Sequence, residues 1–484
     1  MSKTQIVATI GPVSNTPEIL LQMWEAGMTM ARLNGSHNSL EWHAETIGLI
    51  RRILPNVPIL LDIPGRKIRT QFLAVEPRFK IGDTIILTTD SSYSNPDKVP
   101  VNYQSLHEDL SPGDIVFADD GTLKFSVGKV AGRDIFLRAE CNGQLKSCKG
   151  INVPSVRLKT QMITERDHQM IAFAIEHGVD FIGISFVESA EHVNAIRKLT
   201  RGGWPRIVAK VENKAGMDNL RQILDAADAV MIDRGDLSVE TNVENVALYQ
   251  KDILRQAQAQ GKPVIVATEM LSNMIQNCFP TKAEVSDITN AVLDGCAATM
   301  LSGETAVGAY PVEAVATMRH ITAAAMAHIC VRSDNTDSPD PDQPQAMGQA
   351  IALICRQLPI TKIVAITVSG YAARMISVQR PRQPILAVSN DAMAARSFNL
   401  LSGTEGIYLD IPFSKTSTDH IALCLKALWQ QDKLGQEDLI LVTAVGYPRS
   451  GNRMNLMQTH SIADLVEALG WDSPDNPQVV VAAA

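Results

Sequence analysis

Short apolar runs alternate with helical stretches along the first two-thirds of the chain. Each run is rich in Val, Ile, Met and Ala and is followed by a polar or glycine break and then by an amphipathic stretch. Strands are predicted at 5–10, 28–33, 58–62, 180–186, 206–211, 229–233, 263–268 and 298–301. The clearest helices are predicted at 17–26, 40–54, 165–177 and 243–260. Because strands that alternate with helices form right-handed parallel units, eight units with strands apolar on both faces favour an α/β fold, a closed (β/α)8 barrel of the TIM type.

One connection breaks this rhythm, between the third and fourth predicted strands. Residues 70–155 contain period-2 segments at 84–89, 114–118, 124–130 and 134–139, separated by Gly and Asp turns. The stretch is too long for a loop and is predicted to form an inserted small β-barrel domain. Since it follows a barrel strand, it is expected to lie over the mouth of the barrel as a lid. The barrel itself then comprises residues 1–69 and 156–331.

The last third of the chain starts a new α/β pattern. Residues 332–345 are dense in Asp and Pro and predict a linker. Beyond it, strands are predicted at 362–368, 384–389, 406–410 and 438–445, with helices between them. A C-terminal α/β domain is therefore expected at 346–471. The tail at 472–484 carries no strong signal.

Composition and charge narrow the class of protein. The 484 residues are too many for one core and agree with about three domains. The net charge of -8 and the absence of a basic stripe argue against a nucleic-acid partner. The seven cysteines are scattered without CxxC spacing, which favours a reducing compartment. No apolar run reaches the roughly 18 residues of a membrane span, and no signal peptide follows Met1, so a cytoplasmic protein without a membrane partner is expected.

Candidate chemistry gathers where the barrel strands are predicted to end. In such barrels the site forms at the carboxyl ends of the strands. Arg32, Asn34 and Ser36 follow the second strand at i, i+2 and i+4, so an extended chain directs all three the same way. The other strand ends carry Asp62, Lys210 with Glu212, Asp233 with Asp236, Thr268 with Glu269, and Ser302 to Thr305.

These strand ends are typical of a site for a divalent metal and a phosphate. Carboxylates hold a hard cation, and lysine or arginine neutralises phosphoryl oxygens. A single charged residue at a strand end could equally be a solvated residue of the rim. Several charged residues on the same rim favour a binding site. The sequence has no GxxxxGK[ST] loop, no HExxH, no Cys/His cluster and no GxSxG. His37, His43 and His168 are isolated and are interpreted as structural or surface residues.

Ten stretches of the chain resemble pyruvate kinase along nearly its whole length. They are IVATIGPVS (6–14), AGMTMARLNGSH (26–37), LLDIPGRKIRT (60–70), FADDGTL (117–123), GVDFIGISFV (178–187), KVENKAGMDN (210–219), DRGDLSVE (233–240), KPVIVATEML (262–271), PTKAEVSDITNAVLDG (280–295) and MLSGETAVGAYPVEAV (300–315). The resemblance implies a glycolytic kinase that moves a phosphoryl group from phosphoenolpyruvate to ADP, giving pyruvate and ATP. It also implies Mg²⁺ or Mn²⁺ as cofactor, a homotetramer, and allosteric control by a sugar phosphate or nucleotide.

The resemblance also implies roles for individual residues. Glu212 and Asp236 would bind the divalent metal, and Lys210 would stabilise the phosphoryl group in transfer. Arg32 and Arg69 would contact phosphates, and Thr268 would sit beside the enolate carbon that is protonated. The other positions assigned to substrate binding are Gly235, Asp236, Asn34, Ser36, Ser185 and, on the lid, Asp120. Asn34, Ser36 and Asp62 also match the ligands of a monovalent cation.

The chain departs from the family's pattern at several positions near this site. Potassium-dependent members typically read DTKGPEIRT, whereas residues 62–70 read DIPGRKIRT. Lys67 thus replaces a glutamate, and its ammonium could supply the charge that K⁺ otherwise brings, so K⁺ is expected not to be required. Lys67 could alternatively be a solvated rim charge. Arg66, Asp233 and Glu269 replace the usual proline, alanine and glutamine and leave their effect on activity open.

A strand-to-helix turn in the third domain is a candidate effector site. Thr367, Ser369 and Gly370 form a hydroxyl- and glycine-containing turn that can hold a phosphate at a helix N-terminus. In the family this position binds the phosphate of the effector, but a plain structural turn is also possible. The loop at 446–455 departs from the family's threonine-rich form, so the effector's identity stays open.

Two other functions compete with a pyruvate kinase. A Mg²⁺-dependent phosphoenolpyruvate or pyruvate lyase would share the metal acids but has no need of a lid, of Lys210 or of the third domain. A paralogue with an altered acceptor or only a regulatory role would keep the fold, and the departures at Arg66, Asp233 and Glu269 leave room for it. Pyruvate formation from phosphoenolpyruvate, ADP and Mg²⁺, with and without K⁺, separates these alternatives.

Overall fold

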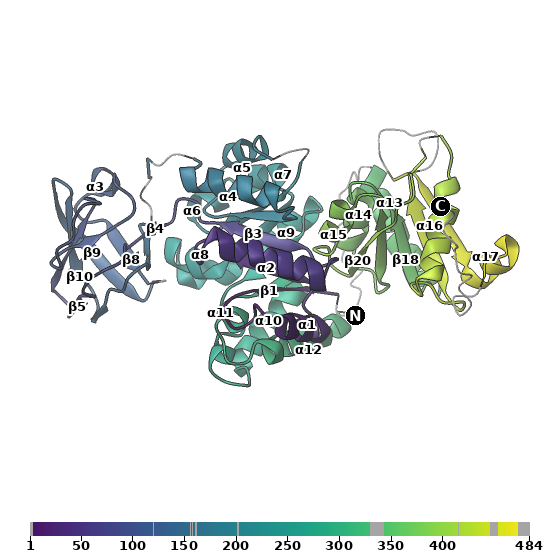
Figure 1. The fold of residues 1–484 in the computed structure, drawn as a ribbon, viewed down its shortest axis with the longest axis horizontal. Helices are drawn as coiled ribbons and strands as arrows, with labels where there is room; N and C mark the ends of the chain where they lie inside the picture. Colours follow the sequence, from purple (N-terminus) through teal and green to yellow (C-terminus); the bar gives the residue numbers. More distant parts are fainter. Residues whose placement is uncertain are drawn as a thin grey trace.

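Three bodies follow one another along the long axis of the molecule (Figure 1). The computed structural model describes residues 3–119, 121–154, 156, 158–159, 162–200, 203–329, 343–414, 416–445 and 454–472. A small β domain lies at one end, a barrel in the middle and an α/β domain at the other end, with the N-terminus between barrel and α/β domain.

The central body is a closed barrel of parallel strands, which confirms the predicted fold class. The strand order is β1-β17-β16-β15-β14-β13-β3-β2, and β1 pairs with both β2 and β17. The strands are β1 Gln5–Thr9, β2 Met30–Asn34, β3 Ile59–Ile63, β13 Phe181–Ile184, β14 Arg206–Val211, β15 Ala229–Asp233, β16 Val264–Ala267 and β17 Ala298–Leu301. Each overlaps a predicted strand. The prediction works because strands of a parallel sheet are buried on both faces and therefore consist of nearly continuous runs of Val, Ile and Met.

Helices surround the barrel strands. They are α1 Pro17–Ala26, α2 Leu40–Ile53, α4 Glu165–Glu176, α5 Ala190–Arg197, α6 Lys214–Asp218, α7 Leu220–Ala226, α8 Arg234–Glu240, α9 Val246–Ala259, α10 Lys282–Asp294, α11 Gly303–Ala306 and α12 Pro311–His328, with 3-10 turns Val243–Asn245 and Ser272–Ile275. Side chains fix several starts: Thr164 with Asp167 and Thr281 with Glu284 form capping boxes. No helix among the described residues is long and apolar enough to cross a membrane.

The sheet of the inserted β domain, called the lid after its predicted role, begins at Ile68, where Ile68 and Arg69 pair with Ile151 and Gly150. Its strands are β4 Ile68–Arg69, β6 Thr84–Thr88, β7 Val99–Pro100, β8 Ile115–Ala118, β9 Leu123–Ala131, β10 Asp134–Ala139 and β12 Gly150–Asn152, with the separate pair β5 Arg78–Phe79 and β11 Gly143–Gln144 and the helix α3 Leu106–Asp109. A bridge between Thr70 and Val101 joins the two edges of this sheet.

The C-terminal domain is a five-stranded sheet of order β20-β19-β18-β21-β22. Its elements are α13 Gln343–Gln357, β18 Lys362–Ile366, α14 Tyr371–Val378, β19 Ile385–Ser389, α15 Ala392–Phe398, β20 Thr404–Tyr408, α16 Asp419–Gln430, β21 Leu439–Ala444, β22 Leu456–Ser461 and α17 Ile462–Leu469. The edge strand β22 was not predicted, because its sequence LMQTHS is polar and lacks a buried face. Helix α13 begins inside the predicted linker 332–345; the rest of that linker up to 342, and residues 473–484 of the tail, lie outside the described residues.

The C-terminal domain docks on the barrel end where the strands begin. Leu400 belongs to the same buried cluster as the barrel-interior side chains of Val7, Leu60 and Phe181. Arg396 Nε donates to Asp180 Oδ1 at 2.8 Å across this interface. The domain therefore closes the bottom of the barrel, opposite the end where the predicted site residues lie.

Candidate active site

Seven charged residues gather at the carboxyl end of the barrel strands. They are Arg32, Asp62, Lys67, Lys210, Glu212, Asp233 and Asp236, and six of these are buried while Lys67 is partly exposed. They come from β2, β3, the turn after β3, β14, β15 and the start of α8. Burial of so many charges is costly unless each is paired, so their contacts decide what the site can hold.

Lys210 is the central cation of this group. Its Nζ lies 2.6 Å from Glu212 Oε1, 3.2 Å from Asp233 Oδ2 and 3.9 Å from Asp62 Oδ2. Burial alone would lower the pKa of Lys210, but the three carboxylates outweigh it and raise that pKa. The side chain is therefore a permanent ammonium.

Glu212 is fully buried, and its two oxygens differ. Oε2 accepts a hydrogen bond from the amide of Phe186 at 3.1 Å, whereas Oε1 has no hydrogen bond and only the ion pair with Lys210. Burial, with the charges of Asp233 and Asp236, raises the pKa of Glu212 to about 7 although Lys210 opposes the shift. A further cation beside Oε1 would stabilise the carboxylate.

Glu212, Asp233 and Asp236 together fit a divalent metal. Each offers a carboxylate oxygen, and these oxygens all lie within 4.8 Å of one another. Oxygens that share one Mg²⁺ at about 2.1 Å lie at most roughly 4 Å apart, so small side-chain movements bring the set onto a single ion. The donor set is all oxygen, which suits Mg²⁺ or Mn²⁺.

Asp233, which the sequence left unexplained, is held by contacts on both of its oxygens. Oδ2 pairs with Lys210, and Oδ1 lies 3.2 Å from the hydroxyl of Thr268. Burial would raise the pKa of Asp233, but Lys210, Lys67 and Arg32 outweigh it and lower that pKa. The extra carboxylate is thus stabilised as an anion next to the predicted metal ligands.

Thr268 occupies a strained position at the end of β16. Its φ is 64° and that of Glu269 is 54°, conformations that non-glycine residues rarely adopt. Its Oγ1 accepts a hydrogen bond from the amide of Gly235 at 2.9 Å, and Arg234 Nη2 donates to its carbonyl at 2.6 Å. These bonds hold the hydroxyl beside the start of α8.

Arg32 is fixed by the carboxylate of Asp62. Nε and Nη2 both donate to Asp62 Oδ2, at 2.9 and 2.7 Å, and Nη1 donates to Thr9 Oγ1 at 3.0 Å. Gly183 lies opposite Asp62 on the neighbouring strand, and a Cβ at Gly183 would collide with Asp62 Oδ1. A glycine is needed there for Asp62 to point into the site.

Lys67 contacts a predicted metal ligand. Its Nζ donates to both carboxylate oxygens of Asp236, at 2.6 and 2.7 Å, and lies 5.7 Å from the centre of the Phe186 ring. Among the described residues, no other carboxylate lies within ion-pair distance of Lys67. It is therefore an internal cation of the site, and not a solvated rim charge.

Comparison with known proteins agrees with this geometry. Residues 1–315 match the family model described as pyruvate kinase, barrel domain, and residues 345–460 match pyruvate kinase, alpha/beta domain. The pyruvate kinase of Geobacillus stearothermophilus is 39% identical over 503 residues, which cover 100% of this chain and 84% of the relative. Those of Bacillus licheniformis and Clostridium perfringens (strain 13 / Type A) are 40% and 37% identical and cover 96% and 93% of this chain and 81% and 97% of their own lengths.

The chain belongs to the pyruvate kinase family. The residues that pyruvate kinase resemblance marks for the monovalent cation do not surround Lys67. Asn34 Oδ1 accepts from the amide of Ser36 at 3.1 Å, and Asp62 is paired with Arg32. Lys67 instead neutralises Asp236, which follows β15, and the strands β13 and β14 lie between β15 and β3.

The pyruvate kinase pattern implies three other residues, and the structure describes two of them, Arg69 and Ser185. Arg69 Nη1 donates to the carbonyl of Cys148 in the lid at 3.1 Å. Ser185 Oγ donates to the carbonyl of Ile63 at 3.0 Å and lies 3.5 Å from Lys210 Nζ. Asp120 lies outside the described residues.

Glu240 is a residue near this site that sequence reasoning missed. It lies one helical turn after Asp236 on α8, and its Oε1 accepts from Asn152 Nδ2 of the lid at 2.7 Å. Burial and then Asp236 raise the pKa of Glu240 to about 7. Its i, i+4 spacing from Asp236 was the signal in the sequence that could have found it.

The candidate effector turn follows β18 and is tightly built. Thr367 Oγ1 accepts from the amide of Gly370 at 3.1 Å, and Gly370 has a φ of 80°. A Cβ at Gly370 would collide with Phe398. Arg206 of the barrel donates from Nη2 to the carbonyl of Ser369 at 3.0 Å, so the turn also touches the barrel.

Proposed function

We propose that this chain transfers the phosphoryl group of phosphoenolpyruvate to ADP, giving pyruvate and ATP, as a glycolytic enzyme. The observation that supports this most is the buried cluster in which Lys210 contacts Glu212 and Asp233 on the rim that also holds Arg32 and Asp236. Phosphoryl transfer depends on placed charge more than on covalent chemistry, and this rim supplies both signs of charge in a partly dry site.

Glu212 and Asp236 would hold Mg²⁺ or Mn²⁺, with Asp233 as a third carboxylate of the same group. When bound, the metal supplies positive charge that polarises and neutralises the phosphoryl and carboxylate oxygens of the substrate. The amides at Gly235 and Asp236, at the start of α8, would bind the substrate carboxylate, and the amide of Gly235 would share its hydrogen between that carboxylate and Thr268 Oγ1.

Lys210, Arg32 and Arg69 would neutralise the phosphoryl group. The ammonium of Lys210 is already fixed by three acids, so little reorganisation is needed as the group moves between oxygens. Arg69 would have to leave the carbonyl of Cys148 to reach a phosphate, and Ser185 beside Lys210 would help to place the substrate. Asp120 would join from the lid.

Thr268 would serve the proton step that follows transfer. The enolate of pyruvate takes up one proton at its methylene carbon, and the Thr268 hydroxyl would lie beside that carbon. The amide of Gly235 donates to this hydroxyl, and the hydroxyl can itself donate to the carbonyl of Ala267 at 2.7 Å or to Asp233 Oδ1 at 3.2 Å. A hydroxyl held in this way can pass a proton from solvent without being consumed.

K⁺ would not be required. The bond of Lys67 to both oxygens of Asp236 places a lysine side chain inside the site, which supports this proposal. Its partner is Asp236, however, and not the group formed by Asn34, Ser36 and Asp62. Replacing Na⁺ by K⁺ at fixed ionic strength should leave the rate unchanged. Strong activation by K⁺ would contradict the proposal.

The turn at Thr367, Ser369 and Gly370 would bind the phosphate of a sugar-phosphate or nucleotide effector. A homotetramer in the cytoplasm, acting without nucleic-acid or membrane partners, would fit the family. These proposals rest on the resemblance and on the built turn.

Pyruvate formation from phosphoenolpyruvate, ADP and Mg²⁺ tests the main proposal. Lys210→Met and Glu212→Ala should each lower kcat by roughly a thousandfold, because each removes charge aimed at the transferred group. Lys214→Met, on an exposed lysine four residues from Lys210, is the matched control and should keep full activity. A lyase would consume phosphoenolpyruvate or pyruvate without ATP formation, and a purely regulatory paralogue would show no turnover.

A further inference from the structure

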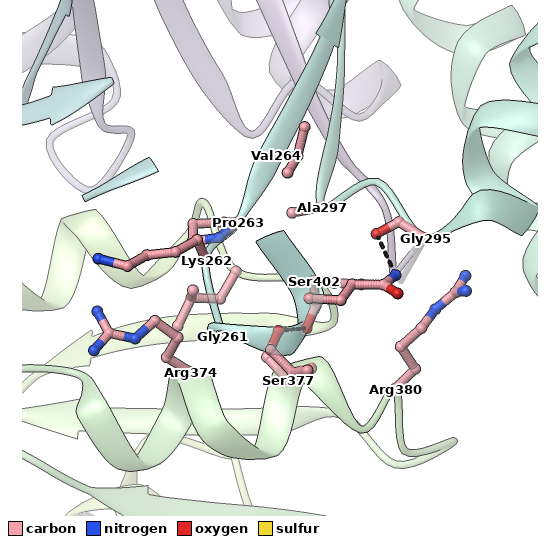
Figure 2. Close-up of a pocket in the computed structure, with 13 residues that line it drawn as sticks. Gly261, Lys262, Pro263, Val264, Gly295, Ala297, Arg374, Ser377, Arg380 and Ser402 are labelled. Atoms are coloured by element: carbon pink, nitrogen blue, oxygen red, sulfur yellow. Dashed lines mark hydrogen bonds between the residues drawn. The ribbon is translucent and has the colours of Figure 1, made fainter. Parts of the chain in front are cut away.

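A crevice separates the bottom of the barrel from the C-terminal domain, far from the rim. Two adjoining cavities form it, and Pro263, Arg374 and Leu401 line both. The first, shown in Figure 2, also has Lys262 on its barrel side and holds about 30 Å³. That is room for about two waters, or for one phosphoryl group.

Positive charge is concentrated along this crevice. Arg206 lines the second cavity, and Lys262 and Arg374 extend side by side toward the same end of the first (Figure 2). The acid that lines the second cavity is Asp228, whose Oδ2 already accepts from Arg197 at 2.9 Å and from the amide of Ile207 at 2.8 Å. In the described part of the chain, no carboxylate lies within ion-pair distance of Arg206, Lys262 or Arg374.

Arg374 is the least satisfied of these cations. Its Nε is buried without a hydrogen-bond partner, and its guanidinium lies 5.2 Å from the centre of the Tyr371 ring. Burial lowers the pKa of Arg374. Burial and then the charge of Arg374 lower the pKa of Lys262 to about 8. The two cations therefore repel each other in a partly dry space.

Arg380 lies at the other end of the cavity, and its hydrogen bonds account for its position in the structure. Its Nη2 donates to the carbonyl of Val292 at 2.7 Å and its Nη1 to that of Leu293 at 3.3 Å, so it caps the end of α10. Lys262 Nζ has one such partner, the carbonyl of Ala227 at 2.7 Å, whereas no carbonyl of the described residues accepts from Arg374. Capping thus explains Arg380 but not Arg374, which faces the charge of Asp228 without forming an ion pair with it in the described part of the chain.

We propose that this crevice is an anion site for a phosphate-bearing small molecule, held by Lys262 of the barrel and Arg374 of the C-terminal domain. The phosphoryl group would neutralise both cations and accept from the free Nε of Arg374. The site is distinct from the turn at Thr367, Ser369 and Gly370, whose amide at Gly370 is already bonded to Thr367.

An occupant of this site would link the two domains to the active-site rim. Lys262 lies two residues before β16, and β16 runs from the crevice to Thr268 at its other end. Arg374 lies on α14, directly after the candidate effector turn. A bound phosphate would therefore clamp α14 against the start of β16 and stiffen the interface.

Thermal unfolding and calorimetric titration of the whole chain with inorganic phosphate, against chloride at equal ionic strength, test this site. The variants are Arg374→Gln and Lys262→Gln, and the control is Arg255→Gln, which removes an exposed arginine of the barrel. The active site can also take phosphate, but it does so in every variant alike, so the difference between variants isolates the crevice. Glycerol 3-phosphate as a second probe distinguishes a metabolite from free phosphate as the tighter occupant.

Two results are expected together. Without phosphate, Arg374→Gln should melt at or above the temperature of the unmodified chain, because it relieves repulsion. With phosphate, the unmodified chain and Arg255→Gln should gain stability, and the crevice affinity should fall at least tenfold in Arg374→Gln and Lys262→Gln. Equal phosphate responses in all four proteins, or no response beyond that of chloride, would overturn the proposal. Neither readout depends on turnover.

Discussion

Lys67 Nζ lies 2.6 and 2.7 Å from the two carboxylate oxygens of Asp236, and so occupies a carboxylate that a divalent metal would also use. The two residues come from different parts of the barrel, the turn after β3 and the first turn of α8. The Lys67 ammonium therefore lies inside the site, where it competes with the metal for the oxygens of Asp236. Replacing either Lys67 or Asp236 should therefore change the affinity of the site for a divalent metal.

Lys67→Met should tighten Mn²⁺ binding by roughly tenfold, about 1.4 kcal/mol, because Asp236 loses its competing cation. Electron paramagnetic resonance of Mn²⁺ measures this without turnover. The same variant should acquire activation by K⁺. Lys98→Met, which breaks an ion pair with Asp134 on the lid, should change neither property. An unchanged Mn²⁺ affinity in Lys67→Met would show that Lys67 does not compete for Asp236.

Asp233→Asn should weaken Mn²⁺ binding by roughly ten- to a hundredfold, as expected for a ligand or close neighbour of the metal. The substitution keeps the shape of the side chain, so Lys210 and Thr268 stay near their places while one negative charge is lost. Asp225→Asn, on the exposed face of α7, is the control. If both variants bind Mn²⁺ with the affinity of the unmodified chain, Asp233 is not a metal ligand and only pairs with Lys210.

Gly183→Ala should lower kcat by about a hundredfold, because the new Cβ displaces Asp62 and with it Arg32. The free energy of unfolding should fall by only about 1–3 kcal/mol, as for other overpacked positions. Steady-state kinetics and denaturant unfolding give the two values. Gly128→Ala, where a Cβ would meet the carbonyl of Phe136 at an ordinary 3.5 Å, should be nearly silent. Full activity in Gly183→Ala would mean that Arg32 needs no fixed partner.

His192 should make the stability of the chain depend on pH. Burial, then the charge of Arg66, lowers the pKa of His192 from 6.5 to about 4. The unfolded chain therefore binds a proton between pH 6.5 and 4 that the folded chain does not, so this contribution is complete above pH 6.5 and is lost as pH falls toward 4.

The size of that contribution is at most about 3 kcal/mol. His192→Gln should flatten this part of the curve of unfolding free energy against pH, measured by denaturant unfolding between pH 4 and 7. His320→Gln, at an exposed position on α12, should leave the curve as it is. The same slope in His192→Gln would assign the pH dependence to other groups.

The sequence by itself determined the barrel, the inserted lid and the third domain, as well as the rim on which the chemistry lies. Buried strands in parallel units have one common carboxyl end, so Lys210, Glu212, Asp236 and Arg32 could be placed together from spacing alone. It also singled out Lys67 and Asp233 as departures from the family.

Only the tertiary structure decided what those departures contact. Lys67 meets Asp236 across 169 positions of the chain, and Asp233 meets Lys210 and Thr268 on the two neighbouring strands. Periodicity reports which face of an element is buried, but not which side chain from another loop arrives there. The sequence did not show the contact of Glu240 with the lid, the edge strand β22 or the burial of Arg374 between two domains. The reason is the same for all three, because each depends on where distant segments pack.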